Sequence, residues 1–132
     1  MDLVSTRLIS DDVKRLVGFY EAVTGLAATW YTDEFAEVGT PVATLAIGST
    51  RTMTLFGAGA ARGGANASAI IEFRVDDVDA RFAALRDRLA DVVQEPTTQP
   101  WGNRSLLVRD PDGNLVNLFT PVTEQAIAKF RR

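Results

Sequence analysis

The chain has 132 residues, of which 46% are apolar and 23% are charged, a composition typical of one compact globular domain. It contains no histidine and no cysteine, which excludes zinc fingers, dithiol redox proteins, and hydrolases that use a cysteine or a serine-histidine pair. A net charge of −3 argues against a nucleic-acid partner, and no apolar stretch reaches membrane-spanning length. The first residues resemble no secretion leader, so we expect a cytoplasmic protein.

The first half of the chain predicts a strand, a helix and three further strands. Apolar side chains recur at helical spacing over residues 13–24, with acidic capping residues before them and Gly25 after them. Three strand-like runs follow, at 27–32, 42–47 and 50–56. The small residues of segment 58–67 then predict a flexible linker.

The second half repeats this order. Ile71, Phe73 and Val75 alternate as in a half-buried strand, and apolar residues at helical spacing follow over 78–89. The later strand-like runs are 92–93, 104–109 and 115–120, with a strong turn signal, Asp-Pro-Asp-Gly, before the last one. The tail predicts a short amphipathic helix. The chain is therefore expected to be one α+β domain over 1–132, with module 1 at 1–57, the linker at 58–67, module 2 at 68–121 and a C-terminal helix at 122–132.

Four segments carry a resemblance to a known family. They are Phe-Tyr-Glu-Ala-Val-Thr-Gly-Leu at 19–26, Val-Asp-Asp-Val-Asp-Ala at 75–80, Pro-Trp-Gly-Asn-Arg at 100–104, and the run from Val108 to Phe119. Together with the doubled β-α-β-β-β order, they resemble the vicinal oxygen chelate superfamily, which includes glyoxalase I, extradiol dioxygenases, fosfomycin-resistance enzymes and antibiotic-binding proteins of the bleomycin-resistance type. The resemblance implies two modules that form an open, cup-like, eight-stranded barrel with helices on its convex face. It also implies a homodimer.

The resemblance further implies four metal-ligand positions on the first and last strands of each module. In this sequence they fall at Ser5, Thr54, Ile70 and Asn117. None is a histidine or a carboxylate, and hydroxyl, amide and alkyl groups bind catalytic divalent cations weakly at best. We therefore expect a protein that uses no metal and no other cofactor.

Strand alternation predicts which side chains face the cavity, because residues two apart share a face. The candidate ligand-binding residues combine aromatic, hydroxyl, amide and charged groups: Arg7, Thr54, Phe56, Glu72, Arg104, Asn117 and Phe119, together with Trp30 and Trp101 from strand edges and loops. Arg104, Leu106 and Val108 are expected on this face. Two alternatives stay open, since a tryptophan can equally close a barrel end or fill a dimer interface, and Glu72 can equally serve a salt-bridge network with Arg74.

The leading hypothesis is a metal-free small-molecule-binding protein, similar to the bleomycin-resistance type, that sequesters an aromatic or amphipathic compound such as an antibiotic. One alternative is a metal-independent enzyme of the lyase or isomerase type, for which Glu72 is the candidate general base. Another is a metal-dependent enzyme of the glyoxalase or dioxygenase type whose ligands lie at other positions. The expected partners are the small molecule and a second copy of the chain, with no nucleic acid and no membrane.

Overall fold

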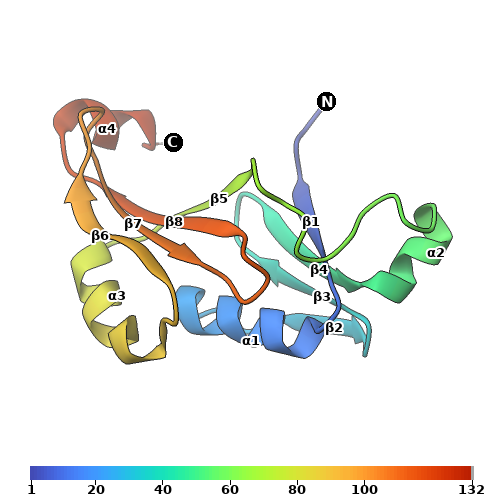
Figure 1. Cartoon of the computed structure of the whole chain (residues 1–132). Coiled ribbons are helices and arrows are strands. Elements are labelled where there is room, and N and C mark those ends of the chain that lie inside the picture. Colours follow the sequence, from blue (N-terminus) through green and yellow to red (C-terminus); the bar gives the residue numbers. More distant parts are fainter. Residues whose placement is uncertain (132) are drawn as a thin grey trace. The chain divides into compact units, whose positions relative to one another are not determined.

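The computed structural model describes residues 1–131 and contains two four-stranded mixed sheets (Figure 1). The elements of the first module are β1 (Ser5–Ser10), α1 (Val13–Thr24), β2 (Thr29–Thr32), β3 (Phe35–Gly39) and β4 (Thr44–Ser49). Those of the second are β5 (Ile70–Arg74), α3 (Val78–Leu85), β6 (Val92–Thr98), β7 (Asn103–Arg109) and β8 (Leu115–Pro121).

Both sheets have the same topology, which confirms the predicted duplication. The strand orders are β1-β4-β3-β2 and β5-β8-β7-β6. In each sheet the first strand pairs in parallel with the last, and the remaining neighbours are antiparallel. The class is therefore α+β, built from two β-α-β-β-β modules.

Both long helices begin where the sequence predicts, and α1 also ends at the predicted glycine, whereas α3 ends at Leu85 and continues as a 3-10 turn at Arg86–Arg88 instead of reaching residue 89. Asp12 caps α1 by accepting a hydrogen bond from the Arg15 amide at 3.2 Å, and Gly25 ends the helix in the left-handed region at φ 72°. Asp77 caps α3 in the same way, through the Ala80 amide.

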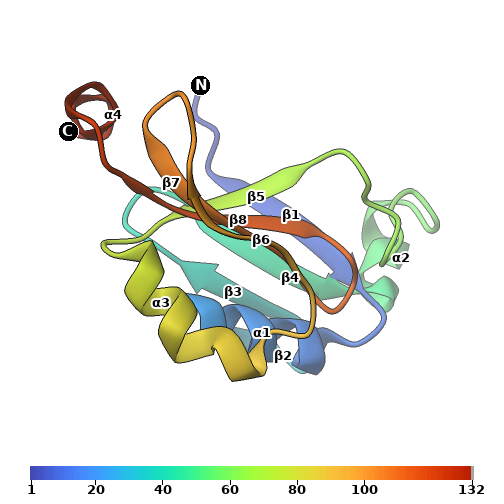
Figure 2. The same cartoon turned by 60° about the vertical axis from the view of Figure 1, so that its left-hand side comes forward.

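Each long helix packs against one face of its own sheet, and Figure 2 shows α3 lying below the second sheet. Five residues of α1 are buried: Val13, Leu16, Val17, Tyr20 and Val23. In the second sheet the fully buried side chains are Leu106, Val108, Val116 and Leu118, and they form the core beneath α3 with Val78 and Leu85. We call the other side of each sheet its helix-distal face.

The strand predicted over 50–56 is wrong. The chain instead forms a 3-10 turn at Thr50–Thr52 and a short helix, α2, at Met53–Phe56. The threonine hydroxyls explain the difference, because Thr52 donates to the Ser49 carbonyl at 2.6 Å and Thr54 donates to the Arg51 carbonyl at 2.9 Å. Such local bonds compete with sheet pairing in a β-branched run that otherwise reads as a strand. The strand that completes the module is β3.

The predicted face of β7 is also wrong. Its register sets Ser105 opposite Phe119 and Leu107 opposite Asn117, so these residues occupy the helix-distal face. Arg104, Leu106 and Val108 consequently point to the α3 side. Leucine stands at both 106 and 107, so hydrophobicity alone left the parity ambiguous, and a shift of one residue exchanges the two faces.

The C-terminal segment forms α4 (Glu124–Lys129), with the Thr123 hydroxyl accepting from the Ala126 amide. The last residue of the helix predicted over 122–132, Arg132, lies outside the described residues. Among residues 1–131, no helix is long and apolar enough to cross a membrane.

Candidate functional site

The helix-distal face of the first sheet carries an arginine between two aromatic rings. Arg7 lies on β1, opposite Ala46 of β4. Its guanidinium carbon is 4.7 Å from the centroid of the Phe35 ring and 4.8 Å from that of Phe56, which reaches the face from α2. A planar cation at these distances is attracted by both ring faces.

A second aromatic side chain extends this surface. The Tyr31 ring stacks on Phe35 with 5.9 Å between centroids and 27° between planes. A hydrogen bond to Glu37, together with the charge of that carboxylate, raises the pKa of the Tyr31 phenol above its ordinary value. Tyr31 is 63% exposed and Phe56 is 67% exposed, so the aromatic surface remains accessible within the module. We call these five residues the Arg7 cluster: Arg7, Tyr31, Phe35, Glu37 and Phe56.

Sequence reasoning proposed only Arg7 and Phe56 of this cluster. Phe35 and Glu37 were missed because β3 was not predicted. Tyr31 could not be assigned to the cluster either, because its place there depends on the stacking on Phe35. The alternation Phe35, Glu37 and Gly39 on one side with Ala36 and Val38 on the other was the available signal.

The helix-distal face of the second sheet holds a polar pair. Glu72 and Asn117 are neighbours across β5 and β8, and the Asn117 side-chain amide donates to a Glu72 carboxylate oxygen at 2.8 Å. Asn117 is only 9% exposed, and its Oδ1 atom is buried without a hydrogen-bond partner within residues 1–131. Unpaired buried acceptors are uncommon and costly, so this oxygen is suited to accept from a bound molecule. Ile70, at 51% exposure, supplies apolar surface on the same face.

Phe119 also lies on this face, but the chain itself covers it. The ring of Phe130, at the end of α4, is 5.3 Å from the Phe119 ring, and Phe119 is only 6% exposed. Arg74 holds Phe130 in place by donating to its carbonyl oxygen at 3.2 Å. A short helix follows each sheet, and a phenylalanine at its end, Phe56 after the first sheet and Phe130 after the second, lies near an arginine of the first strand of that sheet.

Arg104 does not belong to this surface. It points to the other side of the sheet, where its guanidinium donates to both carboxylate oxygens of Asp79 in α3, at 2.8 and 3.0 Å. The paired hydrogen bonds lower the pKa of Asp79 and raise that of Arg104. Arg104 thus links α3 to its sheet through a bidentate ion pair, whose geometry orients both partners.

Thr54 is likewise displaced from the predicted strand face, whereas Trp30 lies at a strand edge, as expected. Trp30 pairs with Ala36 on the α1 side of the edge strand β2 and is 41% exposed. Thr54 belongs to α2, where its hydroxyl donates a hydrogen bond to the Arg51 carbonyl.

Trp101 occupies the tight turn between β6 and β7 and is 66% exposed. Gly102 follows it at φ 93°, and its amide closes the turn on the Gln99 carbonyl at 2.9 Å. A Cβ atom at residue 102 would lie 2.1 Å from the hydroxyl of Thr123, so only glycine lets the turn approach the start of α4. The turn presents the indole at a fixed place on the second module.

The residues at the family's metal positions do not fit a divalent metal. One of these positions must be corrected from Thr54 to Ala46. In the second sheet Asn117 pairs with Glu72, and in the first sheet the corresponding pair is Ala46 with Arg7. The set therefore comprises one serine hydroxyl, one amide and two alkyl side chains. Within the described residues no group of three or more histidine, cysteine or carboxylate side chains could hold a metal ion. Such a donor set lacks the ligands that catalytic cations need.

Two β-α-β-β-β modules, each with candidate residues on the helix-distal face of its sheet, define a protein of the vicinal oxygen chelate type. The chain belongs to the glyoxalase/bleomycin resistance protein/dioxygenase superfamily, whose sequence profile matches residues 2–118.

Individual relatives add the following. The chain is 28% identical over 125 residues to the uncharacterized protein YraH of Bacillus subtilis, covering 90% of this chain and 98% of that protein. A glyoxalase/bleomycin resistance protein/dioxygenase family enzyme from Burkholderia phytofirmans has a TM-score of 0.80 at 16% identity, with 92% and 100% of the two chains covered. A lactoylglutathione lyase from Agrobacterium tumefaciens has a TM-score of 0.69 at 22% identity, covering 89% of this chain and 92% of that one. At these identities the solved structures establish the fold alone.

Proposed function

We propose that this protein is a metal-free small-molecule-binding protein that takes up an aromatic or amphipathic compound, such as an antibiotic, and sequesters it. The observation that carries the proposal is the Arg7 cluster, in which accessible rings surround a cation on a sheet face that its helix leaves uncovered. The absence of metal-binding donors at the family's ligand positions supports binding without chemistry at a metal.

The Arg7 cluster suits a flat ligand that carries an acidic or carbonyl group. A ligand ring would stack on the exposed aromatic surface of Tyr31 and Phe56, where large contact area is gained with little loss of side-chain entropy. The planar Arg7 guanidinium would donate hydrogen bonds to the ligand's oxygen atoms. Glu37 and the Tyr31 hydroxyl add a polar edge to the same surface.

The second module carries its own candidate ligand-binding groups on the helix-distal face of its sheet. The buried Oδ1 atom of Asn117 and the carboxylate of Glu72 accept hydrogen bonds, so they would orient ligand N–H or O–H groups. The exposed side chain of Ile70 provides apolar contact on the same face, and Trp101 presents an exposed indole at the turn between β6 and β7. Mixed apolar and polar groups of this kind are characteristic of ligand sites.

The proposal is tested by titrating planar aromatic antibiotics, acidic and neutral, into the protein and measuring heat of binding and tryptophan fluorescence. We expect saturable binding of at least one compound, weakened at least about tenfold by Arg7→Met, since a charged hydrogen bond contributes more than about 1.4 kcal/mol. Arg88→Met, at an exposed position of the second module, is the matched control and should leave the affinity unchanged. No saturable response across the panel, or equal losses in both variants, would contradict the proposal.

A second candidate function rests on the geometry of Glu72. Its carboxylate is held by the Asn117 amide through one oxygen, which leaves the other free to take a proton from a bound substrate. This would make the protein a metal-independent isomerase or lyase. Glu72→Gln should then abolish turnover while the far-ultraviolet circular dichroism spectrum stays unchanged; retained turnover would reject the role.

The family resemblance also motivates a homodimer, and both sheets have edge strands that offer unpaired backbone groups to a second copy. We propose this assembly together with a cytoplasmic location. Light scattering coupled to size-exclusion chromatography tests the first point, since a mass of one chain at micromolar concentration would reject it.

A further inference from the structure

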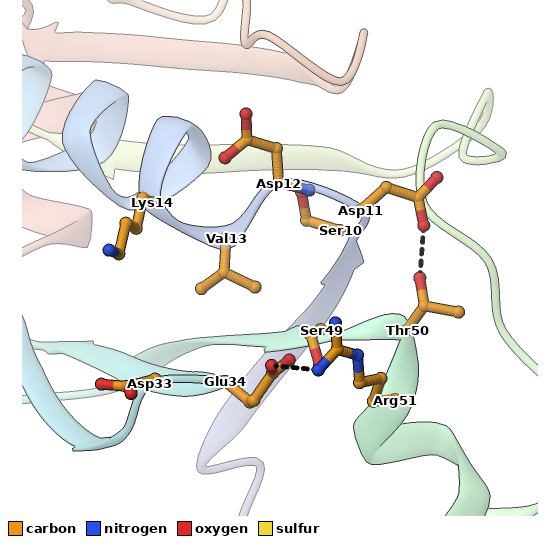
Figure 3. A pocket seen from close by; sticks show the side chains of 10 residues that line it. All are labelled: Ser10, Asp11, Asp12, Val13, Lys14, Asp33, Glu34, Ser49, Thr50 and Arg51. Atoms are coloured by element: carbon orange, nitrogen blue, oxygen red, sulfur yellow. Dashed lines mark hydrogen bonds and ion pairs between the residues drawn. The ribbon is translucent and has the colours of Figure 1, made fainter.

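A separate pocket of about 340 Å³ lies in the first module, at the start of α1 (Figure 3). Three segments line it: residues 10–14, which lead into the helix, residues 33–34 in the turn between β2 and β3, and residues 49–51 at the end of β4. Val13 and Lys14 point from the first helical turn across the pocket toward the side of Asp33 and Glu34. The volume falls in the lower part of the range typical of small-molecule sites.

One buried hydroxyl in this pocket has no partner. Ser49 is 8% exposed, and its Oγ atom makes no hydrogen bond within residues 1–131. Ser49 follows Ile47 by two residues and pairs with Ser10, so its side chain lies on the helix side of the sheet, beneath the start of α1. A buried hydroxyl that lacks a partner costs free energy, which calls for a compensating role.

The second module has a hydroxyl at the position that corresponds to Ser49, and there the hydroxyl is hydrogen-bonded. The registers of the two sheets make Thr120 the counterpart of Ser49. The Thr120 hydroxyl accepts from the Val78 amide and donates to the Val75 carbonyl, both at 2.9 Å, and so ties the start of α3 to its sheet. In the second module the backbone around the start of the helix thus provides both hydrogen-bond partners for this hydroxyl, whereas in the first module the Ser49 hydroxyl has neither among the described residues. Its hydroxyl remains available to a bound molecule.

The charges around the pocket indicate what that molecule carries. Four carboxylates line it against two cations: Asp11, Asp12, Asp33 and Glu34 against Lys14 and Arg51. Arg51 pairs with Glu34 at 3.2 Å, and Asp11 accepts from the Thr50 hydroxyl. These contacts leave an excess of two negative charges, larger than the partial positive charge of a helix N-terminus. A cationic guest is therefore favoured over an anion.

We propose that this pocket binds a small organic cation that carries a primary ammonium group and hydroxyl groups, with the ammonium among the carboxylates and a hydroxyl hydrogen-bonded to Ser49 Oγ. A bare metal ion fits less well, because the described residues contain no cluster of three or more metal-binding side chains. The lining is almost wholly polar, with Val13 as its apolar member, which suits an amino sugar or amino alcohol better than an aromatic compound. This site is independent of the function proposed above.

The test uses three probes in titrations followed by amide nitrogen-proton correlation spectra. Glucosamine supplies both groups, glucose lacks the charge, and sulfate represents an anion at the helix start. We expect glucosamine to shift the amides of residues 10–14 and 49–51 saturably, with glucose at least tenfold weaker and sulfate without saturable effect on them. Equal affinity for glucose and glucosamine, or saturable binding of sulfate at these amides, would overturn the proposal.

Single substitutions measure separately how much the Ser49 hydroxyl and the carboxylate charge contribute to the affinity for glucosamine. Ser49→Ala should weaken glucosamine at least fivefold, and Asp33→Asn at least threefold, while Asp87→Asn, an exposed carboxylate of the second module, should have no effect. Because Ser49→Ala removes a hydroxyl without partners, it should fold with an unchanged or higher melting temperature. Unchanged glucosamine affinity in Ser49→Ala would refute the role of the hydroxyl.

Discussion

Replacing Thr120 by valine tests the hydrogen bonds that tie α3 to the second sheet. The substitution keeps the branched shape and removes both the donor and the acceptor of the hydroxyl. It leaves the Val78 amide and the Val75 carbonyl without the partners that they have at 2.9 Å. The Asp77 cap cannot replace them, since it bonds to the Ala80 amide one turn into the helix.

Each partly buried group that loses its partner costs about 1 kcal/mol, so Thr120→Val should lower the free energy of unfolding by about 2 kcal/mol. Urea denaturation followed by circular dichroism measures this value. Ser49→Ala is the matched control at the corresponding position, where the hydroxyl has no partner, and it should leave stability unchanged or raise it by up to about 1 kcal/mol. Equal destabilisation by both substitutions, or a change under about 0.5 kcal/mol for Thr120→Val, would refute the reasoning.

Three further predictions concern single residues. Gly102→Ala should destabilise the protein by more than about 1 kcal/mol in thermal unfolding, because the residue has a φ of 93° and faces α4 without room for a Cβ atom. Arg104→Gln should return the lowered pKa of Asp79 toward its ordinary value in a carboxyl NMR titration. Because the pKa of Asp79 is lowered in the folded state, the stability that the Asp79–Arg104 pair contributes is present above the ordinary aspartate pKa. This stability is lost as the pH falls through the pKa of folded Asp79, so the free energy of unfolding of the variant should decrease less on acidification. Glu37→Gln should lower the raised pKa of Tyr31, as measured by tyrosinate absorbance, since it removes the carboxylate charge; an unchanged value would contradict the contact.

The fold was predictable where local signals were unambiguous. Acidic caps at Asp12 and Asp77, the glycine at 25 and the Asp-Pro-Asp-Gly turn each specify a backbone feature by themselves, and the structure has each of them. Their repetition in both halves was enough to infer two β-α-β-β-β modules. The failure at 50–56 arose because threonine favours strands by propensity yet forms local side-chain bonds when no neighbouring strand competes.

The candidate site was harder to predict, because it depends on strand parity and register. Arg7, Glu72 and Asn117 were assigned to the helix-distal face, and the sheet registers place them there. Arg104 was assigned to the wrong face because adjacent leucines gave no parity signal. The Phe35 contact with Arg7 connects strands that lie far apart in the sequence, and no local pattern reports such a contact.

The metal-free account is tested most directly by native mass spectrometry of the freshly purified protein, repeated after incubation with nickel, manganese, iron and zinc. The account predicts the mass of the polypeptide without stoichiometric metal in every sample, and a discrete added mass when a binding aromatic compound is supplied. The side chains at 5, 46, 70 and 117 provide no set of donors for a divalent cation. One tightly held metal ion per chain would contradict the account.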